Sequence, residues 1–156
     1  NPAVEGILFD LPHTREGARR LLEEAGVAGR CRLVSGDFFE AVPGGGDAYV
    51  LKSVIHDWDD RHASRVLDTC RRAMPAEATL LLIERVVPDR LDTSVEHQSV
   101  ARSDLHMLVA HGAKERTEAE LGALLAGSGF DLVRVVPAGM GLSLLEAVPS
   151  RTPPSG

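Results

Sequence analysis

One stretch near the middle of the chain places an apolar run directly before a group of ionisable side chains. Residues 47–60 read Asp-Ala-Tyr-Val-Leu-Lys-Ser-Val-Ile-His-Asp-Trp-Asp-Asp. In an open α/β sheet, ligands bind outside the carboxyl ends of the strands, so a strand that delivers Lys52 and then His56 to such an edge is well placed for chemistry. Imidazole titrates near neutral pH, which makes His56 a candidate general base, although a lone histidine is more often structural.

Two acidic residues follow earlier predicted strands. Asp10 comes just after the apolar residues 4–9, and Asp37 comes shortly after the apolar residues 30–34. In nucleotide-binding α/β folds, an acid at a strand end accepts hydrogen bonds from ribose hydroxyl groups. Each acid taken alone is more typical of a turn or a helix cap. The indication of a nucleotide site therefore comes from the presence of two acids at successive strand ends.

Other charged groups allow both a functional and a plain interpretation. Glu84 ends an apolar strand, where a charge is costly to bury unless it is paired, so it is a candidate functional residue. The plain interpretation is that Glu84 is exposed at the end of the strand. The acids around Trp58 could form a metal site with His56 or His62, but acids also favour a helix N-terminus, and we prefer the helix start. The segment 114–117 reads as a solvated helix entry when it is taken alone.

The hydrophobic pattern predicts strands that alternate with helices. Strands are expected at 4–9, 30–34, 48–51, 79–87, 130–136 and 142–148, and helices at 15–25, 60–74, 104–110 and 117–125. This order favours a doubly wound α/β sheet that ends in an antiparallel pair. The polar stretch 91–100 is expected to be irregular, and the Pro-rich tail 150–156 to be frayed.

Composition narrows the possible functions. The chain of 156 residues is long enough for one core, and it contains no apolar run of membrane-spanning length and no signal-peptide pattern. A net charge of −6 without a Lys/Arg cluster argues against a nucleic-acid partner. Cys31 and Cys70 show neither metal-ligand nor disulfide spacing, and they fit a reducing cytoplasm.

Taken together, the motifs resemble the catalytic domain of the S-adenosylmethionine-dependent O-methyltransferases that act on plant phenolics and bacterial natural products. The matching stretches occur in the family's order and spacing, over residues 4–149: Gly6–His13, Gly36–Phe39, Lys52–Asp60, Leu82–Glu84 and Gly112–Thr117. The resemblance implies a Rossmann-like class I methyltransferase sheet with helices on both faces. It also implies metal-free transfer of a methyl group from S-adenosyl-L-methionine to a hydroxyl group of an aromatic small molecule.

The resemblance implies catalytic roles for residues from three separate motifs. His56 would be the general base, and Glu84 and Glu115 would flank its imidazole, orient it and stabilise the imidazolium. Met107 and His111 match positions that line the acceptor pocket in relatives. A positioned base is needed because a phenol has a pKa near ~10 and is a poor nucleophile at neutral pH.

The same resemblance implies the residues that hold the cofactor. Asp10 would bind the ribose, and Asp37 and Phe38 would hold the adenine. Lys52 would contact the methionine part.

The chief departure from the family pattern is an absence at the beginning of the chain. The family places a strand and a Gly-rich loop just before residue 1, and a helical N-terminal domain through which its members form homodimers. The sequence is therefore expected to be a piece of a longer protein, with an incomplete catalytic domain at 1–149 and a flexible tail at 150–156. The missing strand would lie between the strands that end at Asp10 and Lys52. We expect this polypeptide alone to fold poorly and to bind cofactor weakly.

Three alternative functions stay open. A relative that keeps the cofactor but performs hydroxylation or decarboxylation is disfavoured because such relatives tend to lose the base, and His56 and both glutamates are present. A dinucleotide-dependent oxidoreductase would use Asp10, but it gives no role to the His-Asp-Trp or Lys-Glu-Arg-Thr motifs. A non-catalytic binding module is favoured only if the natural chain is this short. The identity of the acceptor is not revealed by the sequence.

Overall fold

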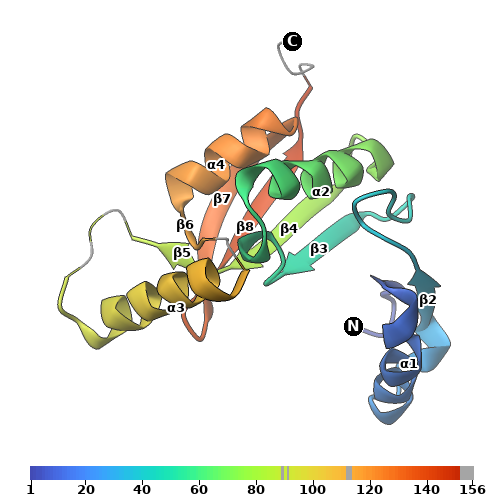
Figure 1. Cartoon of the computed structure of the whole chain (residues 1–156). Helices are drawn as coiled ribbons and strands as arrows, with labels where there is room; N and C mark the ends of the chain where they lie inside the picture. Colours follow the sequence, from blue (N-terminus) through green and yellow to red (C-terminus); the bar gives the residue numbers. More distant parts are fainter. Residues whose placement is uncertain (89, 91, 112–113, 152–156) are drawn as a thin grey trace.

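The computed structural model describes residues 1–88, 90, 92–111 and 114–151, except for the side chains at 96, 99, 103, 106, 110 and 111. The strands are β1 (Gly6–Asp10), β2 (Cys31–Ser35), β3 (Ala48–Lys52), β4 (Thr79–Glu84), β5 (Val86–Val87), β6 (Arg116–Thr117), β7 (Phe130–Gly139) and β8 (Leu142–Pro149). The helices are α1 (Arg15–Glu24), α2 (Asp60–Ala73), α3 (Val95–His111) and α4 (Glu118–Gly127), with short 3-10 turns η1 (Pro12–Thr14), η2 (Ala28–Arg30) and η3 (Ile55–Asp57) (Figure 1).

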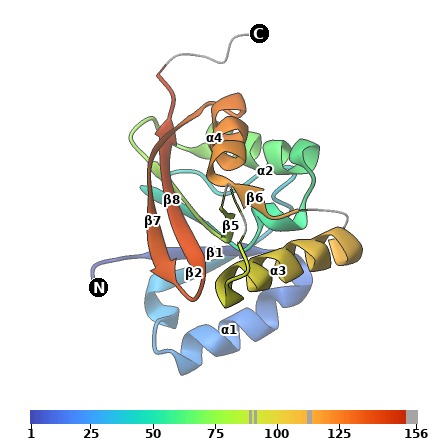
Figure 2. The ribbon, with the colours of Figure 1, turned by 90° about the vertical axis from the view of Figure 1, so that its left-hand side faces the viewer.

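The largest sheet is a mixed sheet of four strands in the order β3-β4-β8-β7. Strands β3 and β4 are parallel, whereas β8 runs antiparallel to both β4 and β7. Figure 2 shows β7 and β8 side by side. The expected alternation of strands and helices and the closing antiparallel pair are thus confirmed. A short parallel pair, β5 with β6, joins the chain just past Glu84 to the segment that carries Glu115 and Arg116.

The sheet is divided between β1 and β3. Strands β1 and β2 form a separate parallel pair, and in the described part of the chain this pair shares no backbone pairing with the larger sheet (Figure 1). Apolar side chains are exposed on both sides of the division: Ile7 at 42%, Leu8 at 38% and Val50 at 57%. The division lies where the family resemblance places a further strand.

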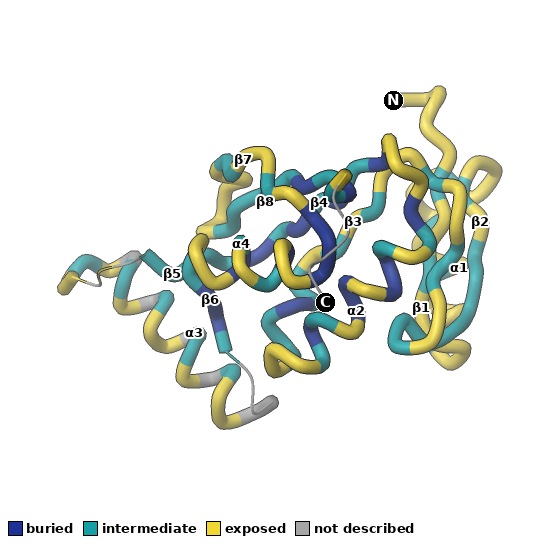
Figure 3. The backbone as a smooth tube through the Cα atoms, turned by 90° about the horizontal axis from the view of Figure 1, so that it is seen from above, coloured by how far each residue is buried: buried dark blue, intermediate teal, exposed yellow. Residues whose placement is uncertain are grey.

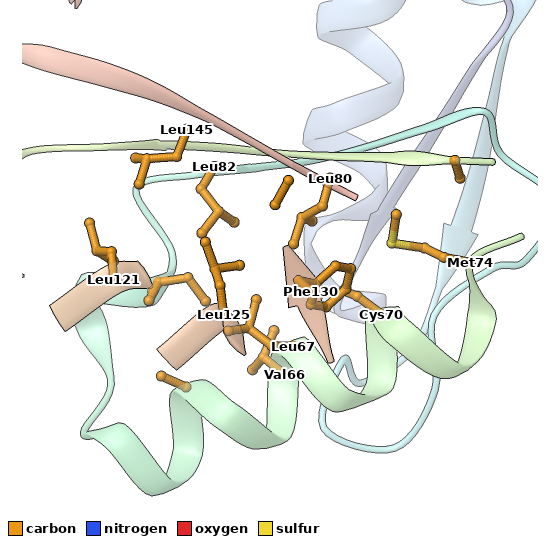
Figure 4. Close-up of a cluster of buried hydrophobic side chains, with 14 residues drawn as sticks. Val66, Leu67, Cys70, Met74, Leu80, Leu82, Leu121, Leu125, Phe130 and Leu145 are labelled. Carbon is orange, nitrogen blue, oxygen red and sulfur yellow. The ribbon is translucent and has the colours of Figure 1, made fainter. Parts of the chain in front are cut away.

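The hydrophobic core lies between the four-stranded sheet and the helices α2 and α4. Strand β4 alternates between half-buried and buried residues, so Leu80 and Leu82 point toward the helices. The core residues that fill this layer in Figure 4 include Val66, Leu67, Cys70, Met74, Leu121, Leu125, Phe130 and Leu145. Buried positions follow α2, β4 and β8 in Figure 3, whereas β1 and α1 have none.

Local capping explains where α2 and α4 begin. The Asp59 carboxylate accepts a hydrogen bond from the backbone N–H of His62, and Thr117 and Glu120 form a reciprocal capping box at α4. Both starts are as the sequence predicts.

The expectation of an irregular stretch at 91–100 is wrong, because α3 begins at Val95. The hydroxyl oxygen of Ser94 accepts from the His97 N–H at 3.3 Å, and Asp92 Oδ1 accepts from the Ser94 N–H at 2.8 Å. Serine is a preferred N-cap residue, so Ser94 was a sequence signal for the start of α3. None of the helices in the described ranges is long and apolar enough to cross a membrane.

Candidate active site

The turn that carries His56 follows β3 directly and is held by a carboxylate from the neighbouring strand. After Lys52 the backbone enters the left-handed region at Ser53, with φ of 54°. The next two amides, of Val54 and Ile55, donate hydrogen bonds to Glu84 Oε1 at 3.0 and 2.8 Å. A non-glycine residue in this region costs about 1 kcal/mol or more, and the charge-assisted hydrogen bonds to Glu84 offset that cost.

The imidazole of His56 lies between two buried carboxylates. Its Nδ1 atom is 3.1 Å from Glu84 Oε2 and 3.6 Å from Glu115 Oε2. The side chain of His56 is 18% exposed, whereas those of Glu84 and Glu115 are each 2% exposed. The other ring nitrogen, Nε2, is 3.3 Å from Asp57 Oδ1. The structure therefore brings together the three residues that the sequence proposes for catalysis.

The carboxylates of Glu115 and Glu84 raise the pKa of His56 from 6.5 to about 10. The interaction of the ring with the carboxylates of Glu115 and then Glu84 is the main cause, and it outweighs partial burial, which lowers the pKa. Glu84 lies closer to Nδ1 than Glu115 does, so we infer that it raises the pKa of His56 at least as much as Glu115 does. Below a pH of about 10 the group is therefore an imidazolium flanked by two anions.

Further contacts fix the position of Glu115. Its backbone N–H donates to Asp104 Oδ1 on α3 at 2.9 Å, and its Oε1 atom lies 3.7 Å from Arg85 Nε. Glu115 and the adjacent Arg116 are only 5% and 3% exposed. The plain interpretation of this segment as a solvated helix entry is therefore wrong for both residues, and so is simple exposure of Glu84, which is 2% exposed.

The candidate cofactor residues Asp37 and Phe38 lie together in the turn after β2. Asp37 Oδ1 accepts a hydrogen bond from the Phe39 N–H at 2.8 Å. The Phe38 ring contacts the rings of Phe39 and Trp58 edge-on, at centroid distances of 4.9 and 6.1 Å. Asp37 also lines a cavity of about 500 Å³ between β2 and the following loop. This corner thus combines a carboxylate with a partly buried aromatic surface.

The other two candidate cofactor residues lie at the ends of strands in different sheets. Asp10 ends β1 and is exposed, with Oδ1 accepting from the Leu11 N–H at 2.7 Å. Lys52 ends β3 and is also exposed. Because β1 and β3 belong to separate sheets in the described chain, the two residues do not share a sheet edge.

The two candidate acceptor-pocket residues belong to α3. Met107 is half-buried, and α3 contacts the η3 turn that carries His56. His111 is the last residue of α3, and its side chain lies outside the described residues.

The acids that follow Trp58 are engaged in other contacts. Asp59 caps α2 and lies 2.8 Å from His62 Nδ1, and Asp60 accepts hydrogen bonds from Arg116. Across the described residues, no group of three histidine, cysteine or acidic side chains is arranged to hold a metal ion.

The chain's similarity to known proteins covers nearly all of this architecture. The family model of the O-methyltransferase domain matches residues 1–131. The chain belongs to this family. It is 49% identical over 148 residues to a phenazine O-methyltransferase from Lysobacter antibioticus, and 48% identical over 151 residues to an O-demethylpuromycin-O-methyltransferase from Streptomyces alboniger. These alignments cover 95% and 96% of the chain but only 42% and 40% of the relatives.

A solved structure supports the same assignment of fold. It is an O-methyltransferase from neocarzinostatin biosynthesis, in complex with S-adenosylmethionine and a 2-hydroxy-5-methyl naphthoic acid. The TM-score is 0.82 at 34% identity, with 94% of this chain and 42% of that chain covered. The family resemblance read from the sequence is thereby confirmed, and the chain spans less than half the length of these relatives.

Proposed function

We propose that the protein containing this chain is an O-methyltransferase that moves the methyl group of S-adenosyl-L-methionine to a hydroxyl group of an aromatic natural product. The observation that carries the proposal is the position of His56 between the buried carboxylates of Glu84 and Glu115, in a chain of the O-methyltransferase family. The names of relatives that act on a phenazine and on demethylpuromycin support an aromatic acceptor.

The residues present fit such a cofactor. Asp37 offers carboxylate oxygens beside the apolar rings of Phe38 and Trp58, a combination that suits a flat base with an amino group. Asp10 would accept hydrogen bonds from ribose hydroxyls, and the ammonium of Lys52 would pair with the carboxylate of the methionine part. When bound, the cofactor supplies a methyl group on a sulfonium centre, which an anionic oxygen attacks readily.

His56 would remove the proton from the acceptor hydroxyl. The reactive form would be the neutral imidazole, which becomes populated as the pH rises toward about 10. Because Nδ1 faces Glu84 and Glu115, the atom of this form that would receive the proton is Nε2. A phenol has a pKa near ~10, and the raised pKa of His56 makes its ring a stronger base toward such a hydroxyl group. The two carboxylates would then stabilise the imidazolium. Met107 and His111 are proposed to line the acceptor pocket.

We further propose that residues 1–149 are the later part of a catalytic domain. A strand with a Gly-rich loop, supplied by preceding polypeptide, would pair with both β1 and β3 and cover Ile7 and Val50. The exposure of these side chains and the greater length of the relatives support this arrangement. By the family resemblance, a helical N-terminal domain would form a homodimer, and the protein would act in the cytoplasm without a nucleic-acid or membrane partner.

The test is a methyl-transfer assay on the full-length gene product with labelled S-adenosylmethionine and a panel of phenols and polyketides. His56→Ala and the exposed control His13→Gln are assayed beside the wild type, and calorimetry measures cofactor binding. We expect label on an acceptor hydroxyl, a loss of turnover of about 100-fold or more in His56→Ala, and unchanged cofactor binding. Full activity of His56→Ala would refute the base assignment, and absence of cofactor binding to the wild type would refute the roles of Asp10, Asp37 and Lys52.

A further inference from the structure

The guanidinium of Arg116 is buried beneath the turn that carries His56. It lies on β6, directly after Glu115, and the residue is 3% exposed. Its Nη1 atom donates to the carbonyl oxygen of Ile55 at 3.0 Å, and its Nη2 atom donates to that of Trp58 at 2.7 Å. Nε donates to Asp60 Oδ1 at 2.9 Å, and Nη2 lies 2.8 Å from the same oxygen. One planar group therefore joins the turn to the start of α2.

These contacts are made to the backbone on both sides of His56, the residue proposed as the base. Ile55 and Trp58 lie on either side of the His56–Asp57 pair, so the guanidinium holds the carbonyl groups at both ends of η3. The amides at the start of the same turn are held from the other direction by Glu84. The turn is thus fixed by a cation on its carbonyl groups and by an anion on its N–H groups.

We propose that Arg116 is a positioning residue for the reaction: it locks the η3 turn so that the His56 ring stays between Glu84 and Glu115. This inference rests on the proposed function, because it assigns Arg116 a role through His56. The two-residue segment Glu115-Arg116 then supplies a carboxylate that faces the His56 ring and a guanidinium that holds the backbone next to His56. Pairing of β6 with β5, just past Glu84, brings this segment to the turn.

Arginine is required for this role because of its geometry. The guanidinium presents five N–H donors in a rigid plane, and Arg116 uses them on three different residues. Lysine keeps the positive charge, but its single ammonium cannot reach all three acceptors in the same way. Arg116→Lys therefore removes the fork and keeps the positive charge near Asp60. A displacement of about 1 Å in a catalytic group can lower turnover by about 100-fold.

The experiment compares Arg116→Lys with Arg134→Lys in the full-length gene product. Arg134 is a matched control on β7, with a side chain that is 63% exposed and paired with Glu146. We expect Arg116→Lys to lower kcat by about 100-fold, while the acceptor KM and the cofactor Kd change by less than about threefold. We expect Arg134→Lys to stay within about twofold of the wild type. Thermal unfolding establishes that each variant is folded at the assay temperature.

A double-mutant cycle with His56→Gln separates positioning from general support of the fold. If Arg116 acts through His56, Arg116→Lys has little further effect on the residual turnover of His56→Gln. An equal loss in both backgrounds, or a kcat of Arg116→Lys within threefold of the wild type, would overturn the inference. A fully active His56→Gln would refute the assignment of His56 as the base and, with it, this inference. A wild-type protein that transfers no methyl group would instead refute the proposed function. The two failures are therefore distinguishable.

Discussion

At the scale of single residues, the proposed reaction depends on the charge around the imidazole of His56. Among the described residues, the acids within 3.6 Å of the His56 ring are Glu84, Glu115 and Asp57, and Arg85 pairs with Glu115. The carboxylates favour the protonated ring, so His56 is a strong base that is rarely neutral at pH 7. A base tuned in this way gives a rate that rises into the alkaline range.

Glu84→Gln tests this tuning with the least structural change. The amide oxygen can still accept the N–H groups of Val54 and Ile55, but the negative charge beside Nδ1 is removed. Loss of a carboxylate lowers the pKa of His56, so the midpoint of the rise in kcat with pH moves to lower pH, and the plateau falls because the ring is held less well. The measurement is a pH–rate profile from pH 6 to about 10.5, with the exposed Glu77→Gln as control. An unshifted midpoint would show that Glu84 does not set the basicity of His56.

The same group predicts how stability depends on pH. The folded pKa of His56 is about 10 and its ordinary value is 6.5, so the folded state binds the proton more tightly. Its contribution to stability is fully present below a pH of about 6.5 and is lost as the pH rises toward about 10. Urea unfolding at pH 6, 8 and 9.5 should show a falling free energy of unfolding for the wild type and a flatter course for His56→Gln. Parallel courses would contradict this assignment.

At the scale of elements, helix α4 depends on the capping box that positions Arg116 and Glu115 just before it. Thr117→Ala removes the hydroxyl that accepts from the Glu120 N–H at 3.2 Å, and we expect a loss of about 1 kcal/mol in the free energy of unfolding. Thr117→Ser keeps the hydroxyl and should lose much less. Chemical denaturation of the two variants measures the difference, and equal losses would show that the cap contributes nothing beyond packing.

The hairpin between β7 and β8 contains two glycines, Gly139 and Gly141, whose substitution by alanine gives a second pair of matched variants. Gly139 and Gly141 both have positive φ, at 83° and 73°, so alanine strains the backbone at either position. A Cβ atom at Gly139 meets nothing within 4 Å, whereas one at Gly141 would lie 2.8 Å from Arg85 Nη1. Both variants should lose about 1 kcal/mol of stability, and Gly141→Ala alone should also lower kcat, because Arg85 pairs with Glu115. Equal kcat values would exclude that coupling.

Local signals predict local features of this chain well, and contacts between distant segments escape them. Asp59 and Thr117 are recognisable caps because the residues that they bind lie within the next turn of helix. The apolar pattern does not reveal the start of α3, because the residues that follow this start are mostly polar and Val95 is 73% exposed. Arg116 looks like a surface residue in the sequence, and only the pairing of β6 with β5 buries it against Ile55 and Trp58.

The three residues proposed for catalysis were predicted in a different way, through the family resemblance. His56, Glu84 and Glu115 come from three distant motifs, and neither periodicity nor spacing reveals that they meet. The family resemblance supplied that expectation, and the structure brings the carboxylates of Glu84 and Glu115 within 3.6 Å of Nδ1 of His56.

At the scale of the whole molecule, the chain consists of a well-packed part and a poorly packed part. The layer of α2, α4 and the four-stranded sheet holds the buried side chains, whereas α1 and β1 hold none (Figure 3). Local stability follows the burial of apolar contacts, so the two parts should open with different free energies. The unpaired edges of β1 and β3 are also open to pairing with another strand.

Hydrogen exchange on the isolated chain 1–156 and on the full-length gene product tests this division. In the isolated chain we expect amides of residues 6–35 to exchange almost unprotected, and those of residues 62–83 to exchange slowly, because only the latter belong to the core layer. If a preceding strand pairs with β1 and β3 in the longer protein, the amides of β1 and β3 become protected there, while those of β4 change little. Strong protection of residues 6–35 in the isolated chain would mean that the small sheet is stable by itself, and that the expectation of poor folding is wrong.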